Sequence, residues 1–127
     1  METKKHLTEL HKEHGLWSKE LEFAKDEIKS FNNRLSEVVT ANTKTEILAN
    51  VEHFQNQFIR HNEVIDELLH DVHSEEHKIV EQAKANNVAT DHKRAEENME
   101  LVDRMQSFTK LFGELKDEFH GFLSQVL

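Results

Sequence analysis

The sequence predicts an all-α fold: an up-down-up antiparallel bundle of three long helices with heptad seams. The 127 residues, the usual size of one domain, include no proline and three glycines, so the residues that end helices are scarce. Apolar residues recur in steps of three and four, as in packed helices. Two polar segments, TANTKTE and KANNVATD, interrupt this spacing. We therefore predict one domain, 1–127, with helices at about 3–40, 44–86 and 90–126.

The first predicted helix has the most regular seam. Its seam positions are apolar except for one histidine, and they are Leu7, Leu10, His14, Trp17, Leu21, Ala24, Ile28, Phe31, Leu35 and Val38. After the first break, Thr43 and Glu46 have the spacing of a capping box, in which both side chains bond to free amides at a helix start. This spacing predicts that the second helix begins there.

The second predicted helix resumes the same spacing but becomes polar toward its end. Its seam runs through Ile47, Val51, Phe54, Phe58, His61, Ile65, Leu68, Val72, Glu75 and Ile79. We interpret His61 as a boundary histidine with satisfied hydrogen bonds, or as a pH-sensitive group. The second break offers Asn86 or Asn87 as a C-terminal cap, and Thr90 or Asp91 as the next N-cap.

The third predicted helix is clear only in its second half. There the seam is Leu101, Met105, Phe108, Phe112, Leu115, Phe119, Phe122 and Val126. Two upstream continuations fit the spacing, one through Asp91, Arg94 and Asn98 and the other through Ala95, Met99 and Val102. Short connections make neighbouring helices antiparallel, and the remaining stripes could accept a second copy, so a dimer is compatible with this fold.

Antiparallel pairing predicts two unlike ends. The first-loop end gathers a phenylalanine-rich set: Phe31, Leu35, Val38, Val51, Phe54, Phe58, Phe119, Phe122 and Val126. The opposite end gathers Glu13, His14, Glu75, Glu76 and the polar start of the third helix. An unpaired buried carboxylate costs several kcal/mol. These groups must therefore form a hydrogen-bonded polar layer, bind a metal ion within the bundle, or reach water at a frayed end.

The stretch LLHDVHSEEHKIVEQ is the richest in ligand-type residues. On a helical wheel His70, His73 and His77 share an outward stripe, whereas Glu75 and Glu76 straddle the core direction. The spacing of His73 and His77 allows them to chelate a divalent metal, although a solvated face has the same pattern. The candidate metal ligands are His14, Glu75, Glu76, His73 and His77, and the metal would be iron or zinc.

Two segments resemble the hemerythrin-like cation-binding family: LHKEHGLW at 10–17 and HSEEHKIVEQ at 73–82. The resemblance implies a helical bundle that holds iron through His14, His73 and His77. A third segment, VEHFQNQFI at 51–59, is similar to segments of small bacterial helical proteins and implies no activity.

The composition disfavours several classes of partner. A net charge of −9 repels nucleic-acid phosphates and anionic membranes. No apolar run approaches the roughly 20 residues that span a bilayer, and the start lacks the apolar stretch of a signal peptide. The chain has no cysteine, which excludes disulfides and thiolate metal sites. We therefore expect a cytoplasmic protein.

No catalytic constellation is complete in this sequence. The segment HSEEH departs from HExxH because serine follows the first histidine, and no glycine-rich phosphate loop is present. We expect a non-enzymatic protein with no required cofactor. The main hypothesis is a scaffold or interaction protein that associates through its helices with a second copy or another helical protein. The alternative hypothesis is an iron- or zinc-binding bundle with its site at the polar end.

Overall fold

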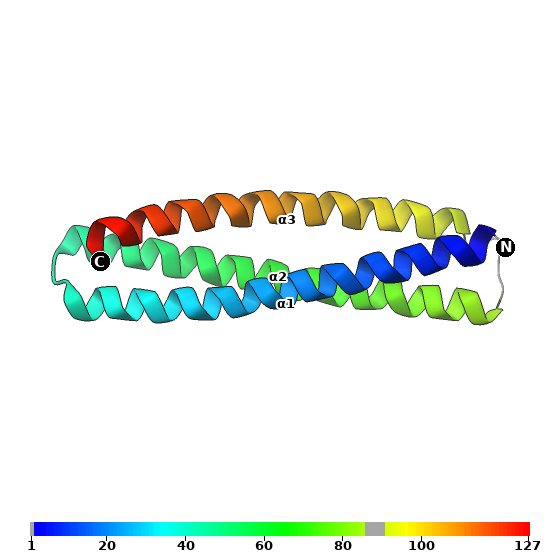
Figure 1. Cartoon of the computed structure of the whole chain (residues 1–127), viewed down its shortest axis with the longest axis horizontal. Coiled ribbons are helices and arrows are strands. Elements are labelled where there is room, and N and C mark those ends of the chain that lie inside the picture. The colour runs from blue at the N-terminus through cyan, green and yellow to red at the C-terminus, as the bar shows by residue number, and fades with distance from the viewer. Residues whose placement is uncertain (1, 86–90) are drawn as a thin grey trace.

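The computed structural model describes residues 2–85 and 91–127, and the side chains of residues 7–85 and 94–127. Within these ranges the chain forms three helices, α1 (Glu2–Ala41), α2 (Thr45–Ala85) and α3 (Asp91–Val126). They lie side by side in an elongated bundle, with α2 antiparallel to both α1 and α3 (Figure 1). The all-α up-down-up bundle is confirmed. The predicted helix bounds at 3, 40, 44 and 126 lie within one residue of those observed, whereas the predicted bounds at 86 and 90 lie outside the described residues.

The connection between α1 and α2 is closed by local hydrogen bonds. The side-chain amide nitrogen Nδ2 of Asn42 donates to the backbone carbonyl of Val38 at 3.0 Å, which satisfies one of the free carbonyls at the end of α1. The backbone amide of Leu48 donates to the carbonyl of Lys44 at 3.1 Å. Lys44 therefore holds the N-cap position, and the predicted capping box that starts at Thr43 is not aligned with the helix start.

Of the two registers predicted for the start of α3, the structure shows the one in which polar residues face the inside of the bundle. Arg94 and Asn98 are buried, whereas Met99 is exposed. The caps predicted at the α2–α3 connection lie outside the described side chains: Asn86, Asn87, Thr90 and Asp91.

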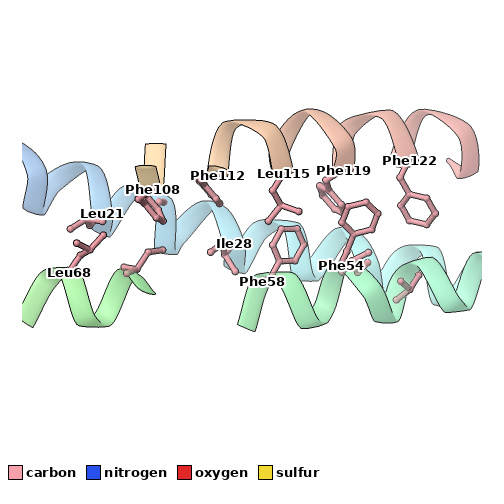
Figure 2. Close-up of a cluster of buried hydrophobic side chains, with 14 of the residues drawn as sticks. Leu21, Ile28, Phe54, Phe58, Leu68, Phe108, Phe112, Leu115, Phe119 and Phe122 are labelled. Atoms are coloured by element: carbon pink, nitrogen blue, oxygen red, sulfur yellow. The ribbon is translucent and has the colours of Figure 1, made fainter. Parts of the chain in front are cut away.

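A phenylalanine-rich core fills the first-loop end of the bundle, as predicted (Figure 2). The ring of Phe119 lies at its centre and is fully buried. Its centroid is 5.1 Å from those of Phe31 and Phe58 and 5.3 Å from that of Phe54. Aromatic pairs at such separations stabilise a core beyond the burial of area alone. Rings from all of the described helices therefore hold this end together.

A smaller apolar cluster lies near the other end, formed by Leu7, Leu10 and Ile79. Between the two clusters the buried residues include polar ones: His14, Glu75, Arg94 and Asn98. The bundle therefore has a polar layer between two apolar regions. Within the described ranges, none of the helices combines the length and the apolar character needed to cross a membrane.

Candidate functional site

His14 is the centre of the polar layer and links α1 to both other helices. Its Nδ1 atom lies 2.9 Å from a carboxylate oxygen of Glu76, and its Nε2 atom lies 2.9 Å from the side-chain oxygen of Asn98. The other carboxylate oxygen of Glu76 forms a hydrogen bond with Nδ1 of His11. The Glu76 carboxylate is thus held between two histidines of α1.

Asn98 extends the network around His14 to a second carboxylate of α1. Its side-chain amide nitrogen donates to Glu13 at 2.9 Å, and its side-chain oxygen faces Nε2 of His14. The ring of Trp17 packs beside that of His14, with 5.4 Å between the two ring centroids. Both nitrogens of the buried His14 ring therefore have hydrogen-bond partners.

Glu75 forms the second half of the polar layer, on the side where α2 meets α3. It is only 4% exposed, and Arg94 donates to it at 3.0 Å. Arg94 and Lys78 also lie 3.2 and 3.3 Å from the carboxylate of Glu97. Burial, together with a hydrogen bond to Glu97, raises the pKa of Glu75 to about 7. The same hydrogen bond lowers the pKa of Glu97.

We expect Glu75 to lower the stability of the chain as the pH rises from about 5 to 8, and Glu75→Gln to remove this contribution; the lowered pKa of His61 acts in the opposite direction in both proteins. The pKa of Glu75 is raised in the folded state from an ordinary 4.5, so the folded chain holds a proton that the unfolded chain releases. That contribution is complete below the ordinary pKa and is lost as the pH passes about 7. Glutamine imitates the protonated acid, so at pH 8 the variant should exceed wild type by about 1–3 kcal/mol in unfolding free energy.

Urea unfolding followed by circular dichroism between pH 5 and 8 measures this effect. Glu63→Gln is the matched control, because Glu63 is an exposed carboxylate of the same helix. Parallel pH profiles for wild type and both variants would show that Glu75 does not titrate in this range.

The structure brings together only part of the predicted metal-ligand set. His14 and Glu76 are in direct contact, whereas Glu75 is paired with Arg94. His73 and His77 are exposed on the outside of α2, as the wheel indicated. In the part of the chain that the structure describes, no three or more histidine, aspartate or glutamate side chains stand in an arrangement that could hold a metal ion.

His11 is the member of this layer that the sequence reasoning missed. It lies one turn before His14 but on an exposed position off the seam. A helical wheel gives the direction of a side chain, and it does not give which residue of a neighbouring helix lies at the same height. One signal could have pointed to His11. It lies three residues before His14, and both histidines face Glu76 when α1 and α2 pair in the observed register.

A groove between α2 and α3 is the second notable feature, and the sequence did not reveal it. Toward the polar end, ion pairs close this seam: Lys78 with Glu97, and Arg104 with Asp71 at 2.7 Å. Two turns farther along, the surface is hollowed to a volume of about 660 Å³, and its lining includes the apolar residues Val64 and Leu111, which cannot form an ion pair. We call this hollow the α2–α3 groove.

His61 lines the α2–α3 groove from the seam of α2. Its ring lies between solvent and the rings of Phe108 and Phe112, with centroids 6.2 and 5.7 Å away. Its Nδ1 atom is buried and has no hydrogen-bond partner, so the interpretation of His61 as a satisfied histidine is wrong. Desolvation and the nearby Arg60 lower the pKa of His61, which favours a neutral ring in this wall.

Comparison with known proteins gave no match to family models, to curated proteins or to solved structures. The resemblance to hemerythrin-like proteins therefore stays a prediction.

Proposed function

We propose that this chain is a non-catalytic helical scaffold or interaction protein that acts through helix–helix association in the cytoplasm. The α2–α3 groove is its contact surface. The observation that carries this proposal is that the apolar residues Leu111 and Val64 line an open groove between α2 and α3, whose contacts toward the polar end are ion pairs. Leu111 is 54% exposed. Covering apolar surface stabilises a complex by about 25 cal/mol per Å², so an amphipathic helix that fills this groove would be favoured.

The partner is a second copy or another helical protein. Metal binding by iron or zinc stays a prediction. His11 and His14 both form hydrogen bonds with the carboxylate of Glu76, so the buried His14 ring and the half-buried Glu76 carboxylate have partners without an ion. That layer is best explained as a device that fixes helix register, as single polar seam residues do in coiled coils.

Photo-crosslinking from two positions tests the proposal. A photoreactive residue at position 111 should give adducts with a helical partner, or with a second copy, when the full chain is irradiated in its source cells. The same residue at position 16 is the matched control, because Leu16 is an exposed leucine, 68% accessible, on the outer face of α1. Equal adducts from both positions, or none from either, would contradict association through the groove.

A further inference from the structure

We infer that the α2–α3 groove binds a basic amphipathic helix from another protein, in preference to a helix of a second copy. This inference rests on the proposed function and specifies its partner class. Three observations carry it: the length of the groove, its apolar floor, and the surplus of carboxylates on its rim.

The length of the groove corresponds to a short helix. Its walls are formed by 53–68 of α2 and 103–118 of α3. At 1.5 Å per residue this is about 22 Å, or roughly four turns of a bound helix. Polar side-chain contacts lie at both ends, Asp71 with Arg104 at 2.7 Å and His53 with Glu118 at 3.4 Å.

The floor of the groove is apolar. It is formed by side chains of both helices: Val64, Leu68, Phe108, Leu111 and Leu115. A stripe of apolar residues at helical spacing is the complement of such a floor. The neutral ring of His61 extends this floor. A lysine or arginine of the partner that lies near this ring is therefore repelled by no cation there except Arg60.

The rim of the groove carries more carboxylates than cations. Among the described side chains that line it, Glu67, Asp103 and Glu114 have no ion pair or hydrogen bond, whereas Arg104 is already paired with Asp71. Arg60 is the remaining cation on this lining. Lysine or arginine residues flanking the apolar stripe of a partner would meet these carboxylates. A second copy of the chain carries a net charge of −9 and would be repelled.

The groove between α1 and α3 is a weaker candidate for docking. It has a volume of about 550 Å³ and is lined by Trp17 and Met105. A hydrogen bond of 3.0 Å from Thr109 to Glu20 already crosses it. A helix that entered there would have to break this bond, whereas the middle of the α2–α3 groove has no such bridge among its described residues.

Binding of two synthetic peptides to the full chain tests the inference. Both probes are fluorescein-labelled helices of about 18 residues with leucine at the seam positions. One has lysine at the flanking positions, and the other has glutamate. Fluorescence anisotropy should show binding of the lysine peptide at least tenfold tighter than that of the glutamate peptide. Leu111→Ser should weaken binding of the lysine peptide at least fivefold. Leu16→Ser, which changes an exposed leucine of α1, should weaken it less than twofold.

A charge-matched pair of triple variants separates the rim from the overall charge. The first variant neutralises the rim carboxylates as Glu67→Gln, Asp103→Asn and Glu114→Gln. The second neutralises three exposed carboxylates of α1 as Glu9→Gln, Glu22→Gln and Asp26→Asn. Both change the net charge equally. The rim variant should bind the lysine peptide at least tenfold more weakly than wild type, and the α1 variant less than twofold more weakly.

The outcomes distinguish the inference from the proposed function. Equal binding of both peptides at the groove would support the proposed function, helix association through the groove, and would overturn the inference that the partner helix is basic. Equal loss in both triple variants would show that binding follows net charge, which overturns the inference. A dimer by light scattering that Leu111→Ser dissociates would make a second copy the occupant, overturning the inference and supporting the proposed function. No peptide binding by a monomeric chain would overturn both.

Discussion

Phe119→Ala is expected to lower the free energy of unfolding by about 3–5 kcal/mol, the cost of removing a fully buried aromatic ring. The ring of Phe119 contacts phenylalanines of α1 and α2, so its loss opens a cavity where all of the described helices meet. The net stability of a domain is about 5–15 kcal/mol, so the variant should lie close to the limit of folding. Urea unfolding followed by circular dichroism measures the change.

Phe23→Ala is the matched control, because the same atoms are removed from a ring that is 65% exposed. It should change the unfolding free energy by no more than about 0.5 kcal/mol, the usual range for surface positions. Similar effects of the two substitutions would contradict the placement of the aromatic core.

Arg94→Met is expected to destabilise the chain by about 3 kcal/mol or more at pH 8, where most Glu75 carboxyl groups are ionised. Methionine fills a similar length but leaves the buried carboxylate without its strongest cationic partner. Lys78 cannot replace Arg94 fully, because its Nζ atom lies 3.9 Å from the carboxylate and the side chain is half exposed. Unfolding in urea at pH 8 measures the loss.

Two further measurements show whether the cost of Arg94→Met comes from the carboxylate. At pH 5 the loss should shrink, because Glu75 is then protonated and needs no counter-charge. The double variant Arg94→Met with Glu75→Leu should recover most of the loss, since apolar residues of similar volume often replace a buried ion pair without cost. A loss that is constant with pH, and that the second substitution does not relieve, would assign the effect of Arg94→Met to packing.

Much of the fold follows from patterns that a single helix displays by itself. The scarcity of proline and glycine, and apolar residues in steps of three and four, are local properties of the chain. They are sufficient for the helix bounds, the up-down-up order and the phenylalanine-rich end. They also indicated that His14 and Glu75 face inward, because a wheel gives the angle of each side chain about its own helix axis.

Antiparallel pairing already placed Glu75, Glu76, His14 and the polar start of α3 at one end of the bundle, and the tertiary structure decided which of these side chains meet. The exact partners of Glu75 and Glu76 depend on the axial register between helices, which separate wheels cannot supply. That register pairs Glu75 with Arg94, and Glu76 with His11 and His14. It also brings Val64 of α2 and Leu111 of α3 to the lining of one hollow, the α2–α3 groove. The sequence by itself therefore determined the helices and their inward faces, and the packing of one helix against another determined the candidate sites.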